Sequence, residues 1–173
     1  GGVYGSMPYD KHREISFIYS LPEMKEELAD YAVKLSNYEG GATIGTYLAD
    51  RAERRGVKFL CFYMVVPAYD FSQLSISVQQ MRIERDYKAW HDLMVRFNHM
   101  FAMNLDLLDL ERQSSELISS MDTKIDALER TMPQLKVREY MEKLASDFVE
   151  MPFVALGDEW ESALEDLFKD TEE

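Results

Sequence analysis

Apolar residues follow one another without alternation from Phe59 to Val66, which is the longest apolar run of the chain. A strand that is apolar on both faces is buried on both faces, and this is typical of a central, parallel strand in a sheet covered by helices. The preceding segment, from about Ala42 to Arg55, has helical periodicity and stops at Gly56. A helix, a glycine and a buried strand in succession indicate half of an α/β unit. We expect the strand to end at Pro67.

The residues before this unit predict two short strands and a helix. Aromatic and β-branched residues bounded by glycine and proline indicate strands at Val3–Met7 and Glu14–Ser20, joined by a polar link. Apolar residues at spacings of three and four then predict a helix that Ser20 caps and that ends near Asn37. Pro22 suits the first turn of such a helix because its missing N–H costs nothing there.

Helical periodicity dominates the chain from residue 78 onward. The predicted elements are a helix from Val78 to Met103, a helix from Leu107 to Arg130, a corner at Pro133, a second arm near Val137 to Val149, an apolar segment Met151–Phe153 and a last amphipathic helix capped by Asp158. The aromatic residues of the first helix are read as core, since an apolar stripe at helical spacing faces the interior of a domain.

Charge divides the chain near Leu105. The formal net charge is −13, and residues 1–105 carry 13 acidic and 12 basic side chains while residues 106–173 carry 19 and 7. We therefore predict two units, an α/β core portion (1–105) and an acidic helical hairpin with a C-terminal helix (106–173). The acidic half argues against nucleic acid and against an anionic membrane surface as partners, because both bind clustered Lys and Arg. The acidic residues either form a solvated helical face or attract a basic partner.

The overall expectation is an α/β fold with a partial, mainly parallel sheet flanked by helices and an acidic helical extension. At 173 residues and 46% apolar content the chain can bury a single core. No run approaches the ~20 apolar residues of a membrane span, and no secretory signal is present, so a cytoplasmic location is expected. Cys61 is the only cysteine and lies within an apolar run, which favours a small buried side chain over a reactive thiol.

Motifs that would define a reaction are missing from the sequence, and we expect no catalytic residue, metal or cofactor. Gly40, Gly41 and Thr43 open a helix and could place backbone amides around an anion; a tight turn is the alternative. His12 and Arg13 lie in the link between the first two strands, where functional polar residues often occur; a salt-linked surface loop is the alternative.

Three stretches together resemble the bacterial and archaeal members of the proteasome assembly chaperone family. They are GGVYGSMPYDKHRE, with a Gly-rich strand and a His-x-Arg-type link; YEGGATIGTYLADRAERRGVKFLCFYMVVPAY, with a glycine loop, helix and buried strand; and the acidic NLDLLDLERQSSELISSMDTKIDALE. The resemblance implies a fold like that of nucleoside phosphorylases and a tendency to self-associate. It also implies that the N-terminal half of the family fold is missing here.

The resemblance leads to a non-enzymatic protein-interaction or assembly-chaperone-like function, with a protein partner or a second copy as ligand. Glu111, Glu116 and Glu129 on the acidic hairpin are the expected contact residues. Family members that dock on the proteasome α ring can end in a hydrophobic-Tyr-x tail, whereas this chain ends in DTEE, so tail docking is not expected. The alternative is a small-molecule enzyme of the ATP-grasp ligase or nucleoside phosphorylase type, with the glycine loop and the His12–Arg13 pair at its pocket.

Overall fold

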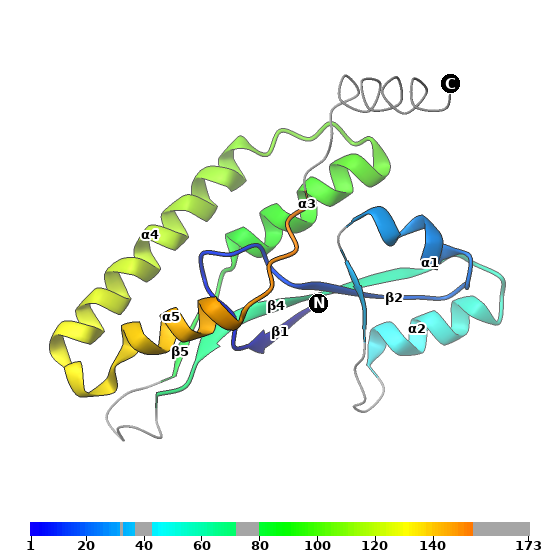
Figure 1. Cartoon of the computed structure of the whole chain (residues 1–173). Coiled ribbons are helices and arrows are strands. Elements are labelled where there is room, and N and C mark those ends of the chain that lie inside the picture. Colours follow the sequence, from blue (N-terminus) through cyan, green and yellow to red (C-terminus); the bar gives the residue numbers. More distant parts are fainter. Residues whose placement is uncertain (32, 37–42, 72–79, 154–173) are drawn as a thin grey trace, which may run out of the picture.

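The structure is a computed structural model and describes residues 1–31, 33–36, 43–71 and 80–153 (Figure 1). Its elements are β1 (Gly2–Gly5), β2 (Ile15–Tyr19), α1 (Met24–Glu27), the 3-10 turn η1 (Ala29–Tyr31), β3 (Lys34–Leu35), α2 (Ile44–Glu53), β4 (Leu60–Tyr69), β5 (Met81–Arg82), α3 (Tyr87–Phe101), α4 (Leu108–Thr131), the 3-10 turn η2 (Pro133–Leu135) and α5 (Val137–Asp147). Among the described helices, none is long and apolar enough to cross a membrane.

Strand β4 is the centre of the sheet, as the uninterrupted apolar run predicts. The strand order is β1-β4-β2-β3, and β5 pairs with the end of β4. The α/β class and the flanking helices are confirmed, but the expectation of a mainly parallel sheet is wrong in detail. The β1–β4 and β2–β3 pairings are parallel, whereas the β2–β4 and β4–β5 pairings are antiparallel. The reason is the short link between β1 and β2, which reverses the chain without a crossover helix and so places β2 antiparallel to its neighbour.

Alternate side chains of β4 point to the two helical layers. Phe62 and Met64 lie in a buried cluster with Ala89 of α3. Cys61 and Tyr63 point to the opposite face, where a Cβ on Gly45 of α2 would collide with the Tyr63 hydroxyl group. A glycine is therefore required where α2 crosses the strand. Helices α3 and α2 thus cover opposite faces of the sheet (Figure 1).

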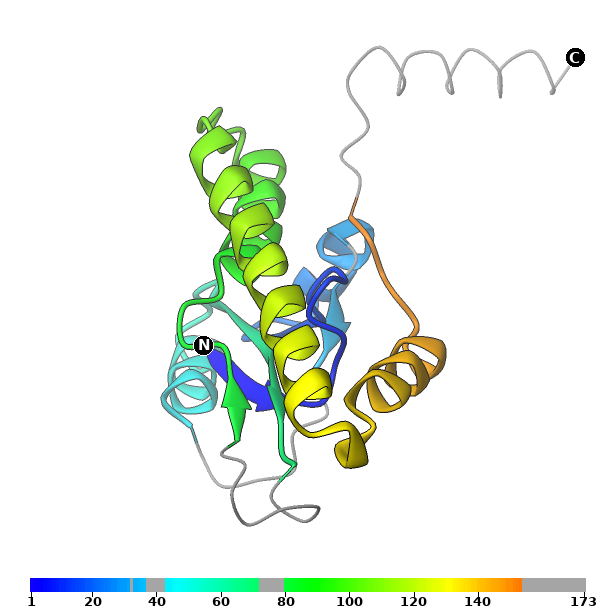
Figure 2. The same ribbon diagram turned by 90° about the vertical axis from the view of Figure 1, so that its left-hand side faces the viewer.

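A second hydrophobic cluster joins the end of the sheet to the helical hairpin. Tyr69 at the end of β4 is fully buried and packs with Met121 and Ile125 of α4 and with Val137 of α5. Its hydroxyl group donates to the carbonyl oxygen of Met7 at 2.7 Å. Figure 2 shows α4 running beside the core and α5 turning back along it. Hydrophobic contacts therefore cross the boundary that the charge distribution places at residue 105.

The long helix predicted between Ser20 and Asn37 is wrong. Helix α1 is a single turn, η1 follows it, and Leu35 belongs to β3, where it pairs with Phe17. Of the predicted apolar residues, Met24 and Leu28 are buried in the cluster between the sheet and α3, whereas Leu35 is 51% exposed. Pairing with an open edge of the sheet overrode helical periodicity, which is a weak preference against tertiary contacts.

The helix predicted from Val78 to Met103 begins later, at Tyr87. Met81 and Arg82 instead form β5 and pair with the last two residues of β4, and the Asp86 side chain caps α3. Strand β4 also continues through Pro67, where it changes partner from β1 to β5. A proline without an N–H is tolerated at that change of partner because no donor is needed there.

The remaining helices agree with the sequence-based expectations. Helix α2 follows Thr43 and is followed by Gly56 at φ +63°, α4 matches the predicted first arm, and η2 and α5 form the corner and second arm. The last helix, predicted after Asp158, lies outside the described residues.

Candidate functional site

The Arg13 side chain lies in the interior, where it binds two elements together. It is 1% exposed. Its Nε donates to Asp86 Oδ2 at 2.8 Å and its Nη2 to Asp86 Oδ1 at 3.1 Å, which makes a bidentate pair. Its Nη1 donates to the carbonyl oxygens of Tyr9 at 3.0 Å and Lys11 at 2.8 Å. One guanidinium group therefore fixes the link after β1 onto the start of α3.

Two aspartates of α3 receive this link. Asp86 also accepts from the backbone N–H of Ala89 at 3.0 Å, so the same carboxylate caps the helix. Asp92 accepts from the backbone N–H of Arg13 at 2.7 Å, and its Oδ1 lies 3.2 Å from His12 Nδ1 and 3.4 Å from Lys88 Nζ. Both carboxylates thus have cationic partners, as a buried charge requires.

Arg96 extends the charged group one turn further along α3. Its Nη1 donates to the carbonyl oxygen of Asp92 at 2.7 Å and its Nε to that of Tyr31 at 2.8 Å. Burial lowers the pKa of Arg96, and Asp92 opposes that shift. Five side chains are buried here and are called the buried ion cluster below: Arg13, Asp86, Lys88, Asp92 and Arg96.

Within the described part of the chain, every buried side-chain nitrogen or oxygen has a hydrogen-bond partner. The polar atoms of the buried ion cluster therefore find their hydrogen-bond partners within the protein, and the cluster holds the backbone segments that it contacts in place. The His12 side chain lies beside Asp92 at the edge of the cluster and is 37% exposed. The assignment of His12 and Arg13 to a ligand stays a prediction, and a ligand at Arg13 would have to displace Asp86.

Sequence reasoning missed the α3 members of the cluster. Lys88, Asp92 and Arg96 are spaced by four residues, so they form one stripe on the helix beside the aromatic stripe. That spacing was the available signal. The spacing by itself does not indicate burial, because charged residues on an amphipathic helix normally face solvent.

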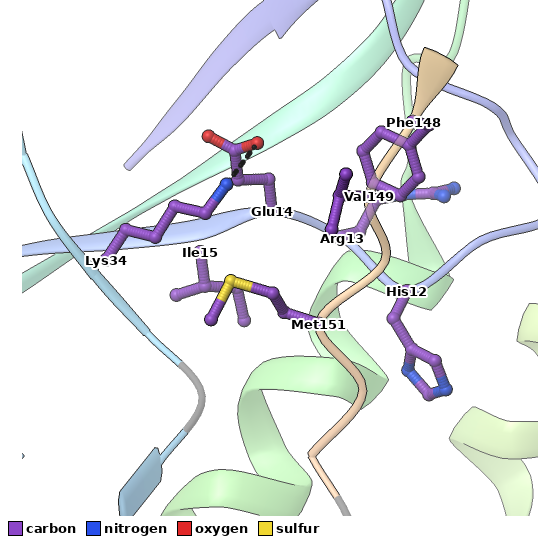
Figure 3. A pocket seen from close by; sticks show the side chains of 8 residues that line it. All are labelled: His12, Arg13, Glu14, Ile15, Lys34, Phe148, Val149 and Met151. Atoms are coloured by element: carbon purple, nitrogen blue, oxygen red, sulfur yellow. Dashed lines mark hydrogen bonds and ion pairs between the residues drawn. The ribbon is translucent and has the colours of Figure 1, made fainter. Parts of the chain in front are cut away.

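A small pocket lies beside the cluster (Figure 3). Its walls include His12, Ile15 and Lys34 from the sheet side and Val149 and Met151 from the segment after α5, and its volume of about 10 Å³ suits a single water molecule. Figure 3 shows the ion pair between Lys34 and Glu14, whose Nζ and Oε2 atoms are 3.2 Å apart. The pocket is thus nearly filled by the chain itself.

A larger groove of about 370 Å³ runs between β1 and the start of α3. Its lining includes Gly2, Met64 and Val66, together with the acidic residues Glu84 and Asp86. Tyr4 and Trp90 are half exposed at its sides, at 50% and 44%. The groove is therefore a partly apolar surface beside a strand that ends the described sheet.

The glycine loop lies mostly outside the described residues, which exclude Gly40 and Gly41. Thr43 is described, and its Oγ1 accepts from the Thr46 N–H at 3.1 Å while the Thr46 Oγ1 accepts from the Thr43 N–H at 2.8 Å. This is a capping box, and the Thr43 hydroxyl group also contacts the Tyr63 hydroxyl group at 2.9 Å. The anion site stays a prediction.

The three acidic residues expected to contact a partner all lie on α4. Glu111 and Glu116 are exposed, and Glu129 is half-buried. Glu116 accepts from Arg112 at 2.5 Å, and Glu129 accepts from the backbone N–H of Arg138 at 3.2 Å. Their role as a partner surface stays a prediction.

The two histidines of α3 do not share a site. The Nδ1 atom of His91 lies 3.8 Å from Asp92 Oδ1, while the His99 ring packs edge-on against Tyr31 and Phe153. Across the described ranges, no group of three or more His, Cys, Asp or Glu side chains is arranged to hold a metal ion.

Two solved structures have a similar fold. One is a PAC2 family protein from Streptomyces avermitilis, with a TM-score of 0.57 and 18% identity; the match covers 74% of this chain and 48% of that one. The other is a proteasome-assembly chaperone homologue from Mycobacterium tuberculosis, with a TM-score of 0.54 and 15% identity over 71% of this chain and 46% of that one. The chain spans about half the length of these structures. No family model and no curated protein matches the sequence.

Proposed function

We propose that this chain is a non-enzymatic, assembly-chaperone-like module of the proteasome assembly chaperone family, and that it binds a protein partner and associates with itself. The observation that carries the proposal is the shared fold with a PAC2 family protein and with a proteasome-assembly chaperone homologue. At such low sequence identity a shared fold supports function only by analogy. The family resemblance of the three sequence stretches points in the same direction.

The surface of the molecule offers contacts of the kind that protein partners use. The groove beside β1 combines apolar lining residues with the half-exposed aromatic side chains of Tyr4 and Trp90. Aromatic residues of this kind are enriched at protein interfaces. The exposed acidic face of α4 adds charge that steers a basic partner.

Native mass spectrometry of the chain, alone and mixed with proteasome α subunits, tests the proposal. We expect a stable homo-oligomer or a complex with the α subunits. Glu111→Lys with Glu116→Lys should weaken whichever assembly uses α4, because it reverses charge on an exposed face. The matched control is Lys143→Glu on α5, which changes charge away from that face. A chain that stays monomeric and binds no α subunit overturns the proposal.

A thermal-shift screen with nucleotides, nucleosides and phosphate tests the enzymatic alternative. Saturable stabilisation that is lost on replacing Gly41 with a bulky residue would support an anion site at the glycine loop and count against the chaperone-like function. We expect no ligand in this screen to stabilise the chain.

A further inference from the structure

Residues 149–153 form a strap that leaves α5 and crosses back over the α/β core (Figure 2). The strap has no helix or strand of its own. Pro152 favours an extended backbone at the residue before it. The strap nevertheless makes specific contacts at two points, which are the side chains of Glu150 and Phe153. It is held by separate side-chain anchors and not by secondary structure.

The first anchor is the Glu150 carboxylate. Its Oε1 accepts from the backbone N–H of His12 at 2.8 Å, and its Oε2 lies 4.0 Å from Lys11 Nζ. The link between β1 and β2 therefore presents a donor and a cation to an incoming carboxylate. The buried Arg13 holds this link rigidly from below through Asp86, so the carboxylate site is pre-organised.

The second anchor is the Phe153 ring. It stacks on Tyr31 with ring centroids 6.0 Å apart, meets His99 edge-on at 5.7 Å, and lies 5.2 Å from the Arg96 guanidinium carbon. A ring placed between an aromatic face and a cation gains both packing and cation–π attraction. This site lies at the far end of the buried ion cluster from the first.

Between the anchors, Met151 forms part of the wall of the small pocket beside Ile15 and Lys34 (Figure 3) and is 38% exposed. Val149, which precedes the first anchor, is 78% exposed. The strap therefore presents three side chains to the core: the carboxylate of Glu150, the apolar side chain of Met151 and the aromatic ring of Phe153. Cations line both anchors, in a chain whose formal net charge is −13.

We propose that this surface is a recognition site for an extended segment of a partner protein with that pattern, and that the strap occupies it as an internal competitor. The inference rests on the proposed protein-binding function and names the chemistry of the partner segment: acidic, then apolar, then aromatic at the third position after the acid. Charge complementarity supports an acidic residue at the first anchor, where Lys11 Nζ lies 4.0 Å from Glu150 Oε2 and 3.6 Å from Asp10 Oδ2. The cation at the second anchor, Arg96, faces the Phe153 ring. Tethering gives the strap an effective concentration in the millimolar range, so a partner binds well only once the strap is released.

Fluorescence anisotropy with a labelled peptide of residues 147–153 tests the site on the full chain. We expect the peptide to bind a Glu150→Lys, Phe153→Ala variant at least about tenfold more tightly than the unaltered chain, because the internal competitor is disabled. A Glu142→Gln chain, changed at an exposed position of α5 outside the strap, should behave like the unaltered chain. Replacing the glutamate or the phenylalanine of the peptide should weaken binding to the released variant by about tenfold or more.

Far-UV circular dichroism and the thermal midpoint confirm that the released variant is folded, and the Phe153→Ala single variant provides a milder release. A folded, released chain that does not bind the peptide overturns the inference. If the unaltered chains exchange straps and form a dimer that the peptide dissolves, the occupant is a second copy and the partner assignment is wrong. Failure of the peptide alone leaves the proposed function standing, since that function is tested by assembly with α subunits.

Discussion

The buried ion cluster and the outer face of α4 use the same residue types in opposite environments. In the cluster, Arg13 and Asp86 are each at most 4% exposed and form a bidentate pair that also caps α3. On α4, Arg112 bridges Asp109 and Glu116 with all three side chains more than half exposed. Water screens the exposed ion pairs of α4 but not the buried ion cluster. Of these two groups, only the cluster should therefore contribute measurably to the free energy of unfolding.

The largest expected effect comes from breaking the buried pair. Arg13→Met should lower the free energy of unfolding by about 3–5 kcal/mol, because Asp86 and three backbone carbonyl oxygens lose their donor. Urea unfolding followed by circular dichroism measures the loss. A combined Arg13→Met, Asp86→Asn chain should recover part of it by removing the stranded charge. A loss below about 1 kcal/mol would mean that burial makes no difference to the charge here.

The inner face of α4 provides the second test. Met121 is 1% exposed within the cluster that joins the hairpin to the sheet. Met121→Ala should cost about 2–5 kcal/mol through the cavity it leaves. The matched control is Ser120→Ala, one residue away on the exposed side, which should be nearly neutral. If the Met121 variant loses only helical signal and the sheet core keeps its unfolding midpoint, the hairpin is an independent unit, as the predicted boundary at residue 105 would require.

Tyr69 gives a smaller effect with a pH signature. Tyr69→Phe keeps the ring but strands the Met7 carbonyl oxygen, at a cost of about 1–3 kcal/mol. Burial raises the pKa of Tyr69 above its ordinary value. The stabilising contribution of the neutral hydroxyl group is therefore complete below about pH 10 and is lost as the pH rises through the raised pKa.

Unfolding midpoints in urea at neutral and alkaline pH measure this difference. The gap between the Tyr69→Phe variant and the unaltered chain should shrink at alkaline pH, since the phenylalanine cannot ionise. Tyr9, whose pKa burial also raises, is present in both proteins. A gap that widens with pH would contradict the assignment.

The smallest effect is expected on the outer face of α4. Arg112→Gln should leave the urea midpoint unchanged, because the ion pairs it removes are exposed and screened. Hydrogen bonds from Arg112 and Gln113 lower the pKa of Asp109, so the variant should raise that pKa toward its ordinary value. A nuclear magnetic resonance titration of the Asp109 carboxylate measures the change. A large fall in the midpoint would show that the exposed charges carry the fold after all.

Local signals in the sequence were sufficient for the elements whose stability is local or whose burial is complete. The uninterrupted run at Phe59–Val66 predicted the central strand, and Gly56 predicted the end of α2. An apolar run without alternation favours a central strand covered on both faces, and a residue at positive φ after a helix favours glycine. Helix α4 could be predicted equally well, since Met121 and Ile125 recur at helical spacing and are buried.

The tertiary structure alone decided the partners of these elements. The segment from Ser20 to Leu35 has helical periodicity, yet its end joins the sheet because β2 offers an unpaired edge to Leu35. The local sequence does not show that Arg13 and Asp86 are buried, because a charge is buried only where distant residues supply its partner. The same holds for the strap, because Glu150 and Phe153 make their contacts only when the fold brings them to His12 and Tyr31. Short stretches of sequence determine local helix and strand preference. The pairing of distant charges and strand edges forms only when the chain folds.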